Sequence, residues 1–242
     1  MIIELRAILL SLILVFFSLV VAIERPFEKN KNIFLEKAGY NNIANALDSS
    51  NGAFVINQFQ TPSSSYKYSA ESQMILDSEN AGGTSSNSEA LSFEFFNQTL
   101  KASLVATENE LVKQFKDAPL TDFIIQVKDK TIGVSVTRGM LFATAKHPHF
   151  TEEDGKQLLE KKLKGVNASS TAMKLERQIL HVWAQSKAIA SILKEVYESL
   201  PRELKSNTVV VVTVCDDPLF REWIFEQKRL TKYSFPSVNS KI

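Results

Sequence analysis

Alternating apolar and polar residues mark one hairpin in the middle of the chain. Residues 123–127 form an apolar run, and residues 131–138 place apolar side chains at every second position. A period of two predicts β-strands, and residues 128–130 between them have the composition of a turn. The other face of the second strand is small and polar, consisting of Gly133, Ser135 and Thr137. Such a face borders a cleft, a closely packed helix or a site.

Apolar residues spaced three and four apart predict helices on both sides of this hairpin. The segment Ser86-Asn-Ser-Glu89 has the spacing of a capping box, so a helix is predicted over residues 87–104. A second helix is predicted from residue 151, where acids occupy the first turn, to a stop at Gly165. A third is predicted to begin after Ser186 and to end before Pro201.

Three further segments predict strands, over residues 110–115, 179–184 and 208–214. The last is β-branched almost throughout, as expected of a central strand that is covered on both faces. Residues 223–225 are expected to add an edge segment. The resulting order, α-β-β-β-α-β-α-β, predicts an α/β domain over residues 86–225 with a mixed sheet flanked by helices.

The two ends of the chain differ in composition from this domain. Residues 7–23 are apolar and uncharged, about as long as the shortest spanning helices of roughly 17 residues. Residues 1–22 are therefore predicted to be a signal peptide or an uncleaved signal anchor. Either one sends the chain into the secretory pathway, as a secreted or a single-pass membrane-anchored protein. Membrane contact is expected only through residues 7–23, in the uncleaved case.

Polar residues and chain breakers dominate residues 23–85, which predicts a low-complexity linker that is partly disordered, with one short helix within residues 33–47. Residues 226–242 are predicted to be a C-terminal tail. The sequence has 28 Lys and Arg against 27 Asp and Glu, so no global field attracts nucleic acid or an anionic membrane. Nucleic acid or another protein remains a candidate partner through a local patch.

Single residues with distinctive chemistry add little to this picture. Cys215 is the sole cysteine, so the domain has no disulfide within the chain, and its place at the end of a valine run indicates a buried thiol. His181 alternates with apolar neighbours, which favours a core position. Of two sequons, that of Asn97 falls on the apolar face of a predicted helix, whereas that of Asn167 follows a predicted helix end. Glycosylation is therefore predicted at Asn167.

The element order, with Thr121-Asp122 opening the second strand and a small polar pair on the third, resembles the restriction-endonuclease-like PD-(D/E)XK fold, whose core is αβββαβ. The resemblance implies that Asp122 and a glutamate of the first helix, Glu94, hold Mg²⁺ in an active enzyme. A hard divalent ion prefers oxygen ligands, and its charge offsets that of a phosphodiester transition state.

The same resemblance indicates a degenerate site. The third-strand acid falls on Ser135 and the lysine on Thr137, with Arg138 as the nearest base. Ser135 is neutral, and Arg138 should lie on the face opposite Thr137 and has too high a pKa for proton transfer. A basic helix face carrying Lys161, Lys162 and Lys164 is either a phosphate-binding surface or an ordinary solvated one.

A second resemblance concerns short stretches of sequence. They are similar to an uncharacterised eukaryotic family named after AAC-rich mRNA clones, a likeness that spans about residues 86–217 and implies no established activity. The stretches are Thr121-Asp-Phe, Ile132-Gly-Val-Ser-Val-Thr-Arg138, Leu158-Leu-Glu-Lys-Lys-Leu-Lys-Gly165, Gln178-Ile-Leu-His-Val-Trp183 and Asn207-Thr-Val-Val-Val-Val-Thr-Val-Cys215.

Three hypotheses follow. The first is a secreted or membrane-anchored protein with a degenerate nuclease-like domain and a binding or structural role, requiring no cofactor. The second is a Mg²⁺-dependent phosphodiesterase that uses Asp122 and Glu94, with Arg138 or a lysine of residues 161–164 on the phosphate. In the third, a purely structural interaction protein, Asp122 only caps the hairpin.

Overall fold

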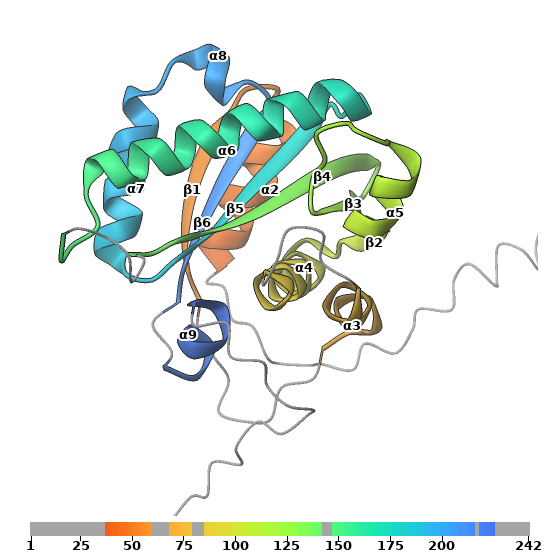
Figure 1. The fold of residues 1–242 in the computed structure, drawn as a ribbon, viewed down its shortest axis with the longest axis horizontal. Helices are drawn as coiled ribbons and strands as arrows, with labels where there is room; N and C mark the ends of the chain where they lie inside the picture. The colour runs from red at the N-terminus through yellow and green to blue at the C-terminus, as the bar shows by residue number, and fades with distance from the viewer. Residues whose placement is uncertain (1–36, 60–67, 79–84, 142–146, 216–217, 226–242) are drawn as a thin grey trace, which may run out of the picture. The chain divides into compact units, whose positions relative to one another are not determined.

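A computed structural model of the chain describes residues 37–59, 68–78, 85–141, 147–215 and 218–225 (Figure 1). These residues fall within one compact unit, Asn32–Ile242. The predicted signal peptide or anchor and the C-terminal tail lie outside the described residues. Within the part of the chain that is described, no helix is both long and apolar enough to cross a membrane.

A six-stranded mixed sheet forms the centre of the fold, in the order β1-β6-β5-β4-β3-β2. Strands β1, β6, β5 and β4 are parallel, whereas β4, β3 and β2 form an antiparallel meander. The strands are β1 (Ala53–Phe59), β2 (Ser103–Thr107), β3 (Phe123–Val127), β4 (Lys130–Gly139), β5 (Arg177–Ala184) and β6 (Thr208–Cys215). The predicted α/β class with a mixed sheet is confirmed.

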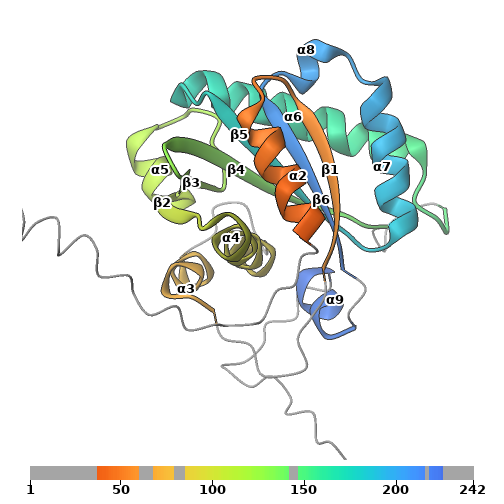
Figure 2. The same ribbon diagram turned by 180° about the vertical axis from the view of Figure 1, so that it is seen from behind.

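Helices cover both faces of this sheet (Figures 1 and 2). Helices α6 (Glu152–Met173) and α7 (Lys187–Ser199) pack on one face, over Leu180 and Val182 of β5. The opposite face is covered by α2 (Lys37–Asp48), α4 (Ser86–Leu100) and α9 (Pro218–Phe225). Side chains alternate along each strand, so His181, which lies between Leu180 and Val182 on β5, faces α4.

The small, polar face of β4 is explained by a closely packed layer. A Cβ atom on Gly133 would lie 2.5 Å from Oε1 of Gln178 and 2.7 Å from Cδ1 of Leu175, so a larger residue would force these side chains to move. Ser135 pairs in register with Leu180, and therefore points to the α6 face as well. Close helix packing accounts for the small residues of this face.

Residues 53–59 do not form part of a linker, contrary to expectation. They form strand β1, which pairs with β6 along its whole length. Arg177 ties this edge to the sheet, because its guanidinium donates to the carbonyl oxygens of Ala46, Asn51 and Asn207. Helix α2 overlaps the short helix that was predicted within residues 33–47 and ends one residue beyond it, and α3 (Ala70–Asp77) packs on α4. The folded region therefore begins well before residue 86.

Residues 110–115 were predicted as a strand and lie mostly in a helix. Helix α5 (Glu108–Gln114) begins with a capping box, in which Glu110 accepts a hydrogen bond from the backbone N–H of Thr107 at 2.8 Å. The strand is β2, which comes earlier in the chain than predicted. It can begin at Ser103 because α4 already ends at Leu100, and the next residue, Lys101, adopts a left-handed conformation with φ 59°. The capping box thus explains why a helix replaced the expected strand.

Two further boundaries differ from the prediction. Helix α6 continues through Gly165 to Met173, since no atom lies within 4 Å of the place that a Gly165 Cβ would occupy and the helix loses no packing there. Residues 223–225 belong to α9, whose Trp223 is buried against α4, and not to an edge strand. A short helix, α8 (Arg202–Lys205), links α7 to β6.

Candidate functional site

Asp122 immediately precedes β3. Because β3 begins only there, the part of β4 after Val134 has no partner strand on this side among the described residues. The last pair of the hairpin is Phe123 with Val134, and the Asp122 N–H donates to the Val134 carbonyl oxygen at 3.0 Å. Beyond this point the Val136 N–H donates to Asp122 Oδ2 at 2.6 Å. The carboxylate of Asp122 therefore satisfies a backbone donor that β3 no longer reaches.

Lys162 of α6 also contacts Val136. Its Nζ donates to the carbonyl oxygen of Val136 at 3.4 Å, and its side chain is half-buried. Val136 thus contacts an acid from the hairpin and a lysine from α6 through its two backbone groups. The positive charge of Lys162 acts to lower the pKa of Asp122.

Glu89 of α4 supplies a second acid to this cluster. Its side chain is buried, with 6% of its surface exposed. Burial and the charge of Glu89 raise the pKa of Asp122 from its ordinary value of 3.8 to about 7, despite the hydrogen bond from Val136 and the charge of Lys162. Burial and the charge of Glu89 therefore outweigh the opposing effect of Lys162 on the Asp122 carboxyl.

Arg138 lies two residues further along β4, on the face opposite Thr137 as predicted. Its guanidinium Nη1 donates to the carbonyl oxygen of Ile224 in α9 at 3.3 Å. Burial lowers the pKa of Arg138, while the negative charge of Glu89 acts in the opposite direction. We call Asp122, Glu89, Lys162 and Arg138 the β4-edge cluster.

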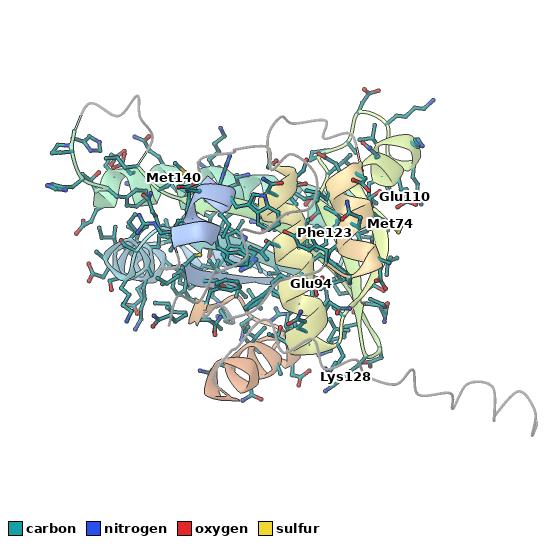
Figure 3. The ribbon with its side chains drawn as sticks, turned by 90° about the horizontal axis from the view of Figure 1, so that it is seen from below. Met74, Glu94, Glu110, Phe123, Lys128 and Met140 are labelled. Carbon is teal, nitrogen blue, oxygen red and sulfur yellow. The ribbon has the colours of Figure 1, made fainter. Side chains whose placement is uncertain are left out.

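The resemblance assigned the helix acid to Glu94, which the structure places elsewhere. Glu94 lies on the side of α4 that faces α3 (Figure 3). Its Oε2 accepts hydrogen bonds from the Ser69 N–H at 2.9 Å and from Ser72 Oγ at 2.6 Å, and its Oε1 accepts one from Gln98 Nε2 at 2.8 Å. The carboxylate therefore fixes α3 to α4, and the α4 acid whose charge reaches Asp122 is Glu89.

Glu89 was not predicted as a site residue, because its spacing from Ser86 is that of a capping box. The helix has Ser85 as its N-cap, without a side-chain capping hydrogen bond. The spacing between Glu89 and Glu94 could have identified Glu89. Five residues turn a helix by about 140° beyond a full turn, so the two acids lie on nearly opposite sides of α4. Only one of them can face the hairpin.

Ser135 and Thr137, the positions matched to the third-strand acid and lysine, lie on the α6 face of the sheet. The hydroxyl of Ser135 is 3.2 Å from that of Thr121, within hydrogen-bonding distance. Ser135 and Thr137 lie on the face of β4 opposite Val136 and Arg138, and the Lys162 amine from α6 reaches the carbonyl oxygen of Val136 between them.

The three candidate phosphate-binding lysines also separate. Lys161 and Lys164 are exposed on α6, and Lys164 Nζ lies 3.5 Å from Glu160 Oε2 in an ion pair within the helix. Lys162 is half-buried and joins the β4-edge cluster. The basic face is therefore largely a solvated surface with one lysine turned towards the site.

The structure removes the reason for expecting a glycan on Asn167. This residue lies inside α6 and not after its end. Its Nδ2, the atom that would carry the glycan, donates to the carbonyl oxygen of Leu204 at 3.0 Å. Modification at Asn167 would require this contact between α6 and the α7–β6 connection to break.

A second polar cluster lies in the core beneath α4, centred on His181 as the alternation of β5 predicts. His181 Nδ1 is 2.8 Å from Ser92 Oγ, and its Nε2 is 2.8 Å from Thr213 Oγ1. Trp183 Nε1 donates to Ser92 Oγ at 2.9 Å. Burial lowers the pKa of His181 to about 3, so the imidazole is neutral at physiological pH. We call these residues the His181 network.

The β4-edge cluster contains two carboxylates, those of Asp122 and Glu89. Among the residues that the structure describes, no three Asp, Glu, His or Cys side chains are grouped closely enough to hold a metal ion. Asp122 is half-buried and Glu89 is buried, and the negative charge of Glu89 raises the pKa of Asp122. Mg²⁺ is commonly held by one or two carboxylates, with water and ligand phosphates completing its coordination. Asp122 and Glu89 are the residues that would supply carboxylates to such a weakly held ion.

Comparisons with known proteins give one similar relative. The chain is 40% identical over 174 residues to the AAC-rich mRNA clone AAC4 protein of Dictyostelium discoideum, an alignment that covers 68% of this chain and 26% of that protein. The chain thus spans about a quarter of the length of this relative. No family model and no solved structure matches the chain. The similarity supports the likeness to the AAC-rich mRNA clone proteins across about two thirds of the chain.

Proposed function

We propose that this protein is a secreted or membrane-anchored binding protein whose domain has a degenerate nuclease-like fold. In this proposal the β4-edge cluster holds a phosphate-containing ligand through a divalent cation and does not cleave it. The observation that carries the proposal is the shared contact at Val136, whose N–H binds Asp122 and whose carbonyl oxygen binds Lys162.

The order of elements supports the nuclease-like part of this proposal. The antiparallel meander β2-β3-β4 follows α4, and α6 then leads to β5, parallel to β4, which matches αβββαβ once the additional helix α5 is set aside. Asp122 opens the second strand of this meander, as the resemblance requires.

The charges of the cluster support cation-dependent ligand binding. Asp122 and Glu89 would hold the cation, and its charge would attract the oxygen atoms of a phosphate. Lys162 is a mobile point charge at the same edge and suits a phosphate oxygen. Nucleic acid and other phosphate esters share this chemistry, and both are candidate ligands.

Three residues favour binding over cleavage. Ser135 and Thr137 carry hydroxyls in place of the third-strand acid and lysine. Arg138 is held by α9 and has too high a pKa for proton transfer. Cleavage by a Mg²⁺-dependent phosphodiesterase is the second candidate, and the presence of Lys162 beside Asp122 is the observation that favours it.

Titration calorimetry of the full-length protein with Mg²⁺ and with Mn²⁺ tests the proposal. We expect saturable binding of the ion in the millimolar range or tighter, and binding of inorganic phosphate only in its presence. Asp122→Asn keeps an oxygen for the Val136 N–H but removes the charge, so it should abolish ion binding. Glu89→Gln should weaken it at least ~10-fold, because the ion loses one of two charged ligands.

Matched variants on the same two helices give the controls. Glu94→Gln removes the other buried acid of α4 and should leave ion binding unchanged. Lys162→Met should weaken phosphate binding, whereas Lys164→Met should not. If no ion binds at millimolar concentrations, the proposal is wrong and Asp122 acts only as a cap on β4. Hydrolysis of a phosphodiester that is lost in Asp122→Asn would favour the enzyme.

A further inference from the structure

Helices α6 and α7, which cover the same face of the sheet, enclose a groove between them (Figures 1 and 2). The two helices pack most closely at Gly155 of α6, where a Cβ atom would lie 3.3 Å from Cγ2 of Val196 and 3.4 Å from Cγ2 of Ile192. The groove has a volume of about 680 Å³. Sites for small molecules and short segments of chain have volumes of roughly 300–1,000 Å³.

The floor of this α6–α7 groove is apolar. Val196, Leu200 and Pro201 line it, and the first two are side chains of the core with 6% of their surface exposed. Ser199 also lines the groove, but its hydroxyl donates to the carbonyl oxygen of Val196 at 2.8 Å. The floor therefore offers mainly apolar contact to a partner.

Glutamates dominate the rim of the groove. They are Glu152, Glu153 and Glu160 of α6 and Glu195 of α7. Lys156 is the one base among the lining residues. The whole chain has 28 basic and 27 acidic residues, so this excess of acids is a local feature. Neighbours on α6 engage two of the acids, because Gln157 Nε2 donates to Glu153 at 2.9 Å and Lys164 Nζ lies 3.5 Å from Glu160.

Helix stability accounts for some of these acids but not for Glu195. Glu152 and Glu153 occupy the first turn of α6, where the helix dipole favours negative charge. Glu195 lies in the C-terminal half of α7, towards the end at which the dipole favours cations. It also lines the same groove as the acids of α6, and like charges repel. A cationic partner in the groove would relieve this repulsion.

The carboxylates are spread along the groove. Glu152 and Glu160 lie about two turns, or ~12 Å, apart along α6. In the part of the chain that the structure describes, no three acidic, histidine or cysteine side chains are grouped closely enough to hold a metal ion. A row of separated cations therefore suits the groove better than a single ion. In an extended peptide, side chains four residues apart lie on the same side at a spacing of about 13 Å.

Lysine has the shape that this groove requires. Its methylene stem lies along apolar surface while its ammonium group extends to a polar rim. We propose that the α6–α7 groove binds an extended, lysine-containing segment of a partner protein. Two lysines four residues apart contact the acids at the two ends of the groove, and an apolar side chain between them contacts Val196 and Leu200. Lys156, which lies between Glu152 and Glu160 on α6, disfavours a third base at the centre. This surface is separate from the β4-edge cluster.

Fluorescence anisotropy of a labelled peptide, Lys-Ser-Leu-Ser-Lys with both ends blocked, tests the proposal on the full-length protein. We expect saturable binding that weakens in about 1 M salt, where the screening length falls to about 3 Å. A peptide with glutamate in place of both lysines should not bind. Glu195→Gln should raise the dissociation constant by about 3- to 5-fold, the usual contribution of one exposed ion pair.

Two further variants sharpen the test. Lys156→Gln removes the base of the groove and should lower the dissociation constant by about 2- to 3-fold. Glu198→Gln is the matched control, because Glu198 lies one turn from Glu195 on α7, outside the lining of the groove, and pairs with Lys194 at 3.8 Å. It should leave binding unchanged. All three substituted side chains are exposed, so the fold should be retained, and thermal unfolding of each variant checks this.

Several results would overturn the proposal. The first is the absence of saturable binding, and the second is an equal loss in Glu195→Gln and Glu198→Gln. Equal binding of the glutamate peptide would mean that the apolar floor alone attracts peptides. Spermidine that binds more tightly than the lysine peptide, with the same dependence on Glu195, would assign the groove to a small polyamine instead of a protein segment.

Discussion

Helix α4 contributes to two polar clusters, through Ser92 to the His181 network and through Glu89 to the β4-edge cluster. The His181 network is wholly buried, and both ring nitrogens of His181 have a hydroxyl partner at 2.8 Å. The β4-edge cluster contains two acids whose charges act on each other, with Lys162 bonded to a backbone carbonyl and not to either carboxylate. The first cluster is a closed hydrogen-bonded network in the core, whereas the second combines two acids with two basic side chains at the edge of β4.

The comparison teaches that burial of polar groups does not by itself indicate a functional site. A network in which each member has a partner contributes rigidity and specificity to a core. A carboxyl whose pKa is raised by burial and by a neighbouring acid costs stability when it is ionised, and such shifted pKa values are typical of functional sites. Substitutions can test the difference between the two clusters and between the two buried acids of α4.

The largest effect is expected from the His181 network. His181→Ala leaves Ser92 and Thr213 without their shared partner and opens a cavity beside Phe95, so the free energy of unfolding should fall by about 3–4 kcal/mol. Urea denaturation at pH 7.5 measures the change. Asp122→Asn in the same assay should lose no more than a small fraction of that amount. Equal losses in the two variants would remove the distinction between the clusters.

An intermediate effect is expected from Glu94, which separates the two acids of α4. Glu94→Ala removes the acceptor of the Ser69 N–H and of the Ser72 hydroxyl, and should cost about 1–2 kcal/mol. Hydrogen exchange should show the loss mainly in the amides of α3. Glu89→Gln is the control and should leave the protection of α3 intact. Unchanged exchange in Glu94→Ala would mean that apolar packing alone holds α3.

The smallest effect is a difference in pH dependence, measured with a chelator present. Asp122 has a pKa of about 7 in the folded chain against an ordinary value of 3.8, so the folded state binds more protons between these values. Its contribution to the free energy of unfolding is complete below pH 4 and is lost as the pH rises through 7. Asp122→Asn should therefore gain about 1 kcal/mol relative to the wild type between pH 4 and pH 8, less than the full shift implies because the carboxylate is half-buried.

His181 provides the opposite sign in the same experiment. Its pKa is lowered from 6.5 to about 3, so the unfolded chain binds the proton first and stability falls as the pH drops below 6.5. Over pH 4–6.5, the contributions of Asp122 and His181 to the stability of the wild type change with pH in opposite directions. Asp122→Asn removes the first, so the loss of stability at low pH that His181 causes should become visible. A constant difference in stability between Asp122→Asn and the wild type across pH 4–8 would contradict the raised pKa of Asp122.

Local periodicity alone was sufficient for several elements of this protein. The hairpin of β3 and β4, the valine strand β6 and the helix α7 all lie where their patterns predict, because a period of two or of 3.6 follows from backbone geometry. The segment that became α5 carried its own signal, the capping box of Thr107 and Glu110, which its apolar residues obscured. The class of the fold and the buried place of His181 also followed from local patterns.

Tertiary structure alone decided the remainder. Strand β1 lies in a polar part of the sequence and is stabilised by pairing with β6, which is remote along the chain. Likewise, α4 carries two buried acids, and only the packing of α3 on one side and of the hairpin on the other assigns Glu94 to a structural contact and Glu89 to Asp122. A sequence determines which residues share a side of a helix, but the neighbour of that side is determined by long-range packing.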